Sequence, residues 1–189
     1  WTRSMEVARA LVACGGGKGT RVGILMTNRA EFLAAFFGTA LAGGVATPLS
    51  TFSTQAELDY LVRASAVSVL LLEPQVLKKD FLGMLLANAP ELAQAVPGQI
   101  RAPRYPFLRH VAMLDRPEGT GGIEPWDSFL SRGEGVAGQL VEARAASVAP
   151  SDPGVLFFSS GTTGRPKGIL SAQRGISIQL WRWPRIFGL

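Results

Sequence analysis

The run Val22-Gly-Ile-Leu-Met26 and the later run Val67-Ser-Val-Leu-Leu-Leu72 decide the fold class of this 189-residue chain. Both are short and apolar, and each predicts a strand. The second is apolar almost throughout, which is typical of a strand that is covered on both faces.

Helix signals fill the interval between these strands. Asn28, with a glutamate three residues later, predicts a helix start, and Gly43-Gly44 predicts its end. The stretch Phe32 to Ala46 is short and interrupted by glycines, so it predicts a buried helix that runs into a strand and no transmembrane segment. Thr54-Gln-Ala-Glu57 forms a capping box that opens a second helix, through about Ala64. The β-α-β-α-β order predicts α/β architecture with doubly wound sheet layers.

The remaining segments predict further elements. Residues 5–13 predict an amphipathic helix, Gly15 to Gly19 a flexible turn, and Leu108 to Leu114 a strand. Segments 97–106 and 115–125 predict surface connections, and Glu142 to Val148 a short helix.

The tail over residues 175–187 mixes aromatic and basic side chains. Base stacking or a position at a membrane interface is one interpretation. We favour a helix that ends before Pro184 and packs Ile178, Trp181 and Phe187 inward.

Composition indicates one sizeable core. Hydrophobic residues make up 47% of the chain and charged residues 17%, which argues against disorder. The net charge is +5 and the pI is about 10.0, but the arginines are scattered from Arg3 to Arg185 without a long basic run. We therefore expect no nucleic-acid partner.

The ten residues that say most about function are Ser159-Ser-Gly-Thr-Thr-Gly-Arg-Pro-Lys-Gly168, directly after the apolar run Gly154 to Phe158. Three glycines allow a backbone to turn tightly and to approach a ligand. Four hydroxyl side chains, freed backbone amides and one lysine can then surround phosphate oxygens. The alternative, a plain turn between strands, does not explain so many hydroxyl groups beside a lysine.

The P-loop of nucleotide triphosphatases does not fit this spacing. Counted from Gly161, its second glycine falls on Pro166, and its magnesium-binding hydroxyl falls on Gly168. Pro166 also disfavours a helix directly behind the loop. The sequence therefore predicts strand, loop and strand, with Ile169-Leu170 in the returning strand.

These residues resemble the signature of the adenylate-forming superfamily, Ser/Thr-Ser-Gly-Thr/Ser-Thr/Ser-Gly-x-Pro-Lys-Gly, at every position. That superfamily comprises acyl-CoA synthetases, aryl-CoA ligases, luciferases and peptide-synthetase adenylation domains. The resemblance covers nearly the whole chain and is least distinctive over Lys78 to Glu124. The other segments that carry it are Arg21 to Phe32, Leu41 to Leu49, Glu57 to Leu61 and Asp152-Pro-Gly154.

The resemblance implies the N-terminal part of an adenylation domain, over residues 1–189, with the C-terminal domain outside this chain. It implies an acid–thiol ligase that joins a fatty, alicyclic or aromatic carboxylic acid to ATP as acyl-AMP and then to coenzyme A. The residues for adenine, ribose, the main magnesium ion and the catalytic lysine would lie beyond Leu189, so the chain alone is expected to be inactive. Two alternatives stay open: transfer to a carrier-protein thiol or oxidation as in luciferases, and a non-catalytic nucleotide-binding scaffold. Such a ligase could be a homodimer.

The resemblance and the loop chemistry together imply a role for each residue of the loop. Lys167, the expected catalytic residue, would add positive charge at the phosphates or brace the loop, and Ser159 would offer a hydroxyl to Mg²⁺. Gly168 would belong to the residues that bind the nucleotide. The cradle for the β- and γ-phosphates would consist of Ser160, Gly161, Thr162, Thr163 and Gly164.

Three other polar residues have weaker functional signals. Cys14 is the single cysteine, so no disulfide forms within the chain, which is consistent with a cytoplasmic location. We expect Cys14 to be an inert thiol and His110 to be a structural histidine. Gln173 stands where relatives often carry a histidine, and a glutamine cannot ionise.

Overall fold

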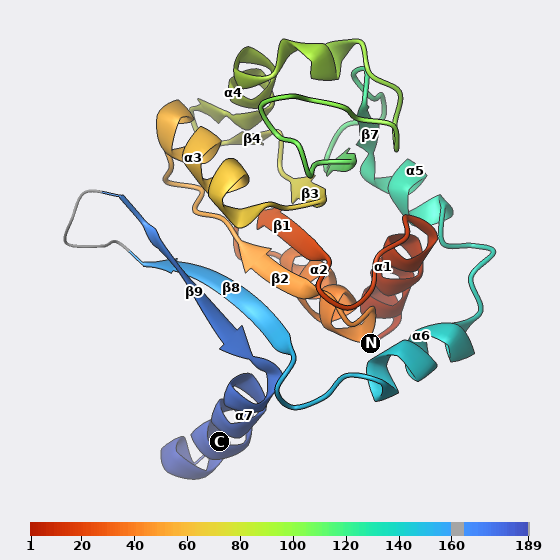
Figure 1. Ribbon diagram of the computed structural model, residues 1–189, viewed down its shortest axis with the longest axis vertical. Helices are drawn as coiled ribbons and strands as arrows, with labels where there is room; N and C mark the ends of the chain where they lie inside the picture. Colours follow the sequence, from red (N-terminus) through yellow and green to blue (C-terminus); the bar gives the residue numbers. More distant parts are fainter. Residues whose placement is uncertain (160–164, 189) are drawn as a thin grey trace.

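The computed structural model describes residues 1–159 and 165–188. Within these residues, seven strands form one twisted sheet with helices on both of its faces (Figure 1). The strand order is β7-β6-β3-β1-β2-β8-β9, and a separate two-stranded ribbon is formed by β4 and β5. The elements are α1 Thr2–Ala13, β1 Arg21–Leu25, α2 Ala30–Leu41, β2 Val45–Pro48, α3 Gln55–Ser65, β3 Val69–Leu72, β4 Gln75–Val76, β5 Lys79–Asp80, α4 Phe81–Asn88, the 3₁₀ turn Pro90–Ala93, β6 His110–Met113, β7 Ile123–Pro125, α5 Trp126–Ser131, α6 Gly138–Ala146, β8 Pro153–Ser159, β9 Lys167–Ala172 and α7 Gln173–Phe187.

The sheet is mostly parallel. β1 lies between β2 and β3, with Val22 in register with Ala46 on one side and with Val69 on the other. β9 differs, because it runs antiparallel to β8 at the edge of the sheet. The predicted doubly wound α/β sheet is confirmed.

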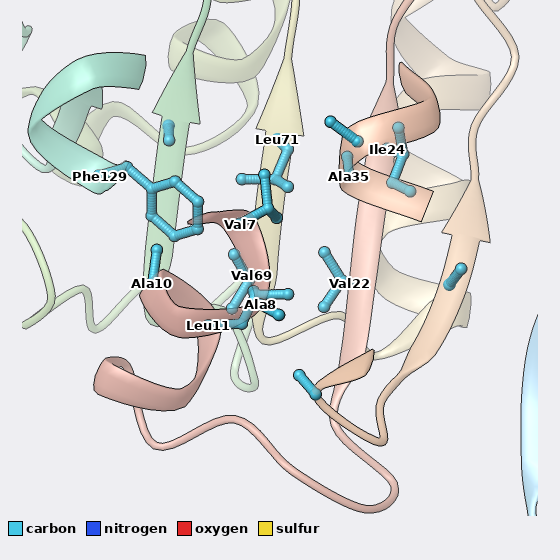
Figure 2. Packing of buried hydrophobic residues seen from close by; sticks show 14 of the residues in the cluster. Val7, Ala8, Ala10, Leu11, Val22, Ile24, Ala35, Val69, Leu71 and Phe129 are labelled. Atoms are coloured by element: carbon cyan, nitrogen blue, oxygen red, sulfur yellow. The ribbon is translucent and has the colours of Figure 1, made fainter. Parts of the chain in front are cut away.

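Alternation along the strands sorts the apolar side chains into two core layers. Val22 and Ile24 point to the face covered by α1, α2, α5 and α6, whereas Leu25 points to the face covered by α3 and α4. Figure 2 shows the first layer, where Val7 and Leu11 of α1 and Phe129 of α5 meet the strands. Each strand of the middle of the sheet is therefore apolar on both faces.

Several local signals are found where the sequence predicts them. α3 begins with the complete capping box, in which the Glu57 amide donates to the Thr54 hydroxyl and the Thr54 amide donates to Glu57. The chain turns between α1 and β1 at Gly15 and Gly19, whose φ angles of +78° and +77° suit glycine.

The start of α2 differs from the prediction. Its N-cap is Arg29, which makes no side-chain capping bond, so the assignment of the cap to Asn28 is wrong. The preceding turn is held from outside the helix, because the Thr27 amide and hydroxyl both donate to Glu73. α6 also begins earlier than predicted, at Gly138.

The two segments predicted as surface connections contribute to the core. Ile100 and Tyr105 are buried in the second layer, and Ile123 is buried in β7, which adds an edge strand to the sheet. In these segments, turn-forming residues separate short buried stretches. A prediction based on composition does not detect those buried stretches.

The prediction for the C-terminal helix is wrong in two respects. α7 continues through Pro184 to Phe187, and Ile178, Trp181 and Phe187 are 40%, 60% and 68% exposed. α7 packs against the ends of β8 and β9, which leaves most of its apolar face in solvent. In the part of the chain that the structure describes, no helix has the length and hydropathy needed to cross a membrane.

Candidate functional site

Two antiparallel strands carry the ends of the predicted phosphate loop. β8 ends at Ser159 and β9 begins at Lys167, and these two residues are paired in the ladder. Directly paired residues project from the same face of a sheet, with Cβ atoms about 5 Å apart. The Ser159 hydroxyl and the Lys167 ammonium group therefore start from neighbouring positions at the mouth of the loop. The predicted strand–loop–strand arrangement is confirmed for these two limbs.

The structure does not describe the central residues of the predicted phosphate cradle. Ser160, Gly161, Thr162, Thr163 and Gly164 lie outside the described residues. Their assignment to the β- and γ-phosphates stays a prediction of the sequence.

Gly168 has a packing role in the hairpin. It is paired with Phe158, and a Cβ atom at this position would lie 3.2 Å from Leu156 Cδ1. That approach is tighter than ordinary van der Waals contact, so the absence of a side chain lets the two strands and Leu156 pack closely. A contact between Gly168 and a ligand stays a prediction.

A cavity of about 390 Å³ lies beside the described limbs of the loop. Its polar groups include the Glu57 carboxylate, and hydrogen bonds from the Thr54 amide and hydroxyl hold the pKa of Glu57 below its usual range. An ionised carboxylate repels phosphate, so the cavity does not extend the phosphate-binding groups of the loop. Its lining consists of Pro48, Leu49, Ser50, Ser53, Glu57, Leu61, Phe157, Phe158, Ser159 and Pro166.

Gln173 lies at the opposite end of the hairpin from the loop. It opens α7, its amide donates to the Asp152 carbonyl at 2.9 Å, and its side chain packs over Gly154. Six strand residues separate this end of β8 from Ser159, a span of about 20 Å. Because of this distance, the glutamine at position 173 does not take part in the loop.

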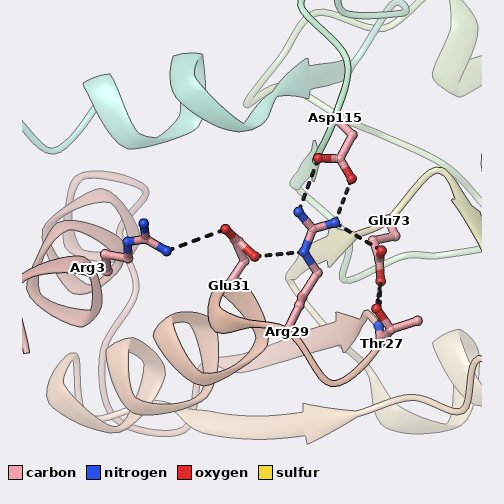
Figure 3. A network of polar contacts seen from close by, with 6 residues as sticks. All are labelled: Arg3, Thr27, Arg29, Glu31, Glu73 and Asp115. Carbon is pink, nitrogen blue, oxygen red and sulfur yellow. Dashed lines mark hydrogen bonds and ion pairs between the residues drawn. The ribbon is translucent and has the colours of Figure 1, made fainter.

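Sequence reasoning missed a polar network at the carboxyl ends of three neighbouring strands, β1, β3 and β6. Arg29 donates to Glu31 at 2.7 Å, to Glu73 at 3.0 Å and to Asp115 at 2.6 Å (Figure 3). Glu73 directly follows β3, and Asp115 lies shortly after β6. The available signal was the presence of charged residues just behind apolar strands.

The charges of this network compensate one another. Hydrogen bonds from Arg29 to Asp115 and Glu31 raise the pKa of the guanidinium group above its ordinary value, and Arg29 also lowers the pKa of Glu31. Arg3 approaches Glu31 at 3.6 Å from α1. The network therefore ties the ends of these strands together. It is a structural feature of the carboxyl end of the parallel sheet, the end at which β8 leads into the loop.

The lone cysteine is partly buried and the lone histidine is buried. Burial raises the pKa of Cys14 to about 11, so its thiol stays protonated near neutral pH. His110 lies in β6 with its Nδ1 atom unpaired among the described residues, and burial followed by the charge of Arg132 lowers its pKa. Both agree with the structural roles that the sequence predicts.

A mostly parallel α/β sheet whose β8–β9 hairpin carries a Ser/Thr/Gly/Lys loop matches the N-terminal domain of the adenylate-forming enzymes that the sequence resembles. The sequence matches the family described as AMP-binding enzyme over residues 1–188, and the chain belongs to that family.

Curated relatives of this chain include CoA ligases and an acyl-CoA synthetase. YngI of Bacillus subtilis, named as a candidate acyl-CoA synthetase, is 32% identical over 165 residues, which are 87% of this chain and 30% of YngI. A Mycobacterium tuberculosis CoA ligase, named for a methyl-dioxo-octahydroindenyl propanoyl substrate, is 35% identical over 88% of this chain and 29% of its own length. The anthranilate CoA ligase AuaEII, solved with anthranoyl-AMP, is 26% identical with a TM-score of 0.72 over 95% of this chain and 30% of that one. The chain thus spans about 30% of the length of the curated relatives it matches.

Proposed function

We propose that the full-length protein is an ATP-dependent acid–thiol ligase and that this chain is the N-terminal part of its adenylation domain. The observation that carries the proposal is the pairing of Ser159 with Lys167 at the mouth of a loop rich in glycine and hydroxyl groups. Family membership over residues 1–188 supports the same chemistry.

The reaction would proceed in two steps. A carboxylate oxygen of the substrate attacks the α-phosphorus of ATP, the bond to the bridging oxygen breaks, and pyrophosphate leaves with acyl-AMP formed. The thiol of coenzyme A then attacks the acyl carbon and releases AMP. In the first step the residues of the loop would orient the phosphates and offset the charge that develops on pyrophosphate.

Lys167 has the clearest role among the described loop residues. It is exposed, and no carboxylate of residues 1–159 or 165–188 forms an ion pair with it, so its ammonium group is available to a ligand. We assign to it the charge stabilisation of the departing pyrophosphate.

Magnesium would enter with the nucleotide. Within the described parts of the chain, no group of three or more His, Cys, Asp or Glu side chains could hold a metal ion unaided. Mg²⁺ prefers oxygen ligands and is commonly bound through substrate phosphates, so the Ser159 hydroxyl fits as one ligand among those oxygens. The bound ion would supply further positive charge to the phosphates.

The test is acid-dependent exchange of radiolabelled pyrophosphate into ATP by the full-length protein, with fatty, alicyclic and aromatic acids. Exchange that requires one class of acid supports adenylation and identifies the substrate class. No exchange with any acid, in a folded protein, contradicts the proposal and favours a non-catalytic scaffold. A second assay for acyl-CoA distinguishes coenzyme A from a carrier-protein acceptor.

Lys167→Ala supplies the residue-level test. We expect the variant to slow adenylation about 10²-fold or more while the KM for the acid changes little, because the lost charge acts on the phosphates. Lys78→Ala, at another exposed lysine that lies outside the β8–β9 hairpin, is the matched control and should behave like wild type. Unchanged adenylation in Lys167→Ala would refute the assignment.

The cytoplasmic location and the homodimer stay predictions of the sequence. The native mass of the purified protein tests the homodimer.

A further inference from the structure

A hydrogen bond joins helix α3 to the outgoing limb of the phosphate loop. The Tyr60 hydroxyl donates to the Pro166 carbonyl at 3.0 Å, across 106 positions of sequence. The guanidinium carbon of Arg165 lies 5.8 Å from the centroid of the Tyr60 ring, within the range of a cation–π contact. Both partners of Tyr60 directly precede Lys167, so one side chain contacts the limb that carries the catalytic charge.

The hairpin has few other attachments near its tip. Among the described residues, β8 joins the parallel sheet through a single registered pair, Ala46 with Val155, close to the start of β8. Beyond that point the hairpin projects away from the sheet (Figure 1), and Phe157 and Ile169 are 44% and 52% exposed. Phe158 packs against the second core layer from β8. On the β9 side, Tyr60 provides the corresponding anchor.

Helix α3, which carries Tyr60, is held firmly in the fold. Its N-terminus has the Thr54–Glu57 capping box, and its Leu58 and Leu61 side chains are buried. Next to Tyr60, Asp59 accepts two hydrogen bonds from Arg104, at 2.5 and 2.8 Å. A helix fixed at its start, its buried face and its flank can hold Tyr60 in one place.

Pro166 needs such a partner because of its place in the hairpin. The β8–β9 ladder ends at the Ser159–Lys167 pair, so Pro166 lies just outside it. Proline has no backbone N–H, which leaves its carbonyl as the only backbone group through which this residue can be tied down. Tyr60 uses that carbonyl.

We propose that Tyr60 is a positioning residue, which fixes the Arg165–Lys167 limb against α3 and so holds Lys167 where the phosphates of ATP are bound. The inference rests on the proposed function for its link to ATP, and on the Tyr60–Pro166 geometry alone for the anchoring. Loss of the hydroxyl would let the limb move relative to the sheet, and ATP would have to restore the correct position at a cost in affinity.

The experiment compares Tyr60→Phe with Tyr105→Phe in the full-length protein. The two tyrosines are the only ones in this chain, and each substitution removes one hydroxyl and keeps the ring. The Tyr105 hydroxyl also donates to Asp59, but both Arg104 bonds to Asp59 remain in Tyr105→Phe. This variant therefore reports the general effect of losing a hydroxyl near α3.

Two measurements are made on each variant. In pyrophosphate exchange we expect Tyr60→Phe to raise the KM for ATP about fivefold, the equivalent of one ordinary hydrogen bond, with the KM for the acid unchanged. In amide hydrogen exchange we expect the peptide that spans residues 165–168 to exchange faster in Tyr60→Phe. Tyr105→Phe should leave both values at those of wild type and lower only the thermal stability.

The outcomes separate the two proposals. If wild type catalyses exchange but Tyr60→Phe has an unchanged KM for ATP and unchanged amide exchange, the role of Tyr60 is overturned and the ligase function stands. If wild type is inactive with every acid, the ligase function fails. Amide exchange over residues 165–168 then decides the anchoring by itself, because unchanged protection in Tyr60→Phe would overturn it. Arg165→Gln, which keeps the hydroxyl bond, should have a smaller effect than Tyr60→Phe.

Discussion

Replacing Gly38 with alanine tests the packing of α1 against α2, on which the first core layer depends. A Cβ atom at position 38 would lie 2.7 Å from Val7 Cβ and 2.8 Å from the Ser4 carbonyl oxygen. Carbon atoms in contact are normally about 3.5 to 4.0 Å apart. Because the Ser4 oxygen belongs to the backbone of α1, relief requires a shift of the whole helix.

Two opposing free-energy terms determine how much Gly38→Ala changes the stability of the protein. Alanine is favoured over glycine inside a helix by about 1 kcal/mol. Forcing an extra methyl group into a packed core costs about 1 to 3 kcal/mol, and the upper part of that range applies where the obstacle is backbone. We therefore expect Gly38→Ala to lower the free energy of unfolding by about 1 to 2 kcal/mol.

Gly175→Ala is the matched control, because Gly175 also lies in a helix but has no heavy atom within 4 Å of the added Cβ. Only the propensity term remains there, so this variant should be more stable than wild type by up to about 1 kcal/mol. Urea unfolding followed by circular dichroism measures both. If Gly38→Ala is as stable as wild type, α1 and α2 are not packed as closely as these contacts require, and the reasoning is refuted.

Three further outcomes are expected from local features. Thr54→Ala should lower the free energy of unfolding by about 1 kcal/mol in urea, because it removes the acceptor of the Glu57 amide; a change below a few tenths would contradict the capping box. The lowered pKa of His110 means that the unfolded chain binds its proton first, so stability should fall as pH drops below about 6.5, and this slope should be smaller in His110→Phe; equal slopes would exclude the histidine as its source. Cys14, with its pKa near 11, should resist iodoacetamide at pH 8 until urea is added, and rapid labelling of the folded protein would show that the thiol is accessible.

Local rules predicted the elements whose signals lie within a few residues. The capping box at Thr54 and Glu57 stands where the sequence places it, because both partners are in the same turn of chain. β3 is buried on both faces, as its unbroken apolar run indicates. Pro166 predicted a returning strand behind the loop, and β9 is that strand.

Prediction failed where a distant partner decides the outcome. The turn before α2 is held by Glu73, 46 positions after Thr27, so Asn28 does not act as the cap that its residue type suggests. The segment before Pro125 forms β7 because β6 offers it an edge to pair with. α7 keeps most of its apolar face exposed because β8 and β9 are the main elements that the described fold places against it.

The amino-acid sequence by itself determined the doubly wound α/β class, the strand–loop–strand context of the phosphate loop and the residues of its two limbs. Hydrophobic periodicity, capping and proline geometry act over a few residues, and they are legible without knowledge of the fold. Only the tertiary structure decided that Arg29 would meet Glu73 and Asp115, and that Tyr60 would reach Pro166. Those contacts join residues far apart in the chain. They exist because strand order and helix packing bring separate segments close together in space.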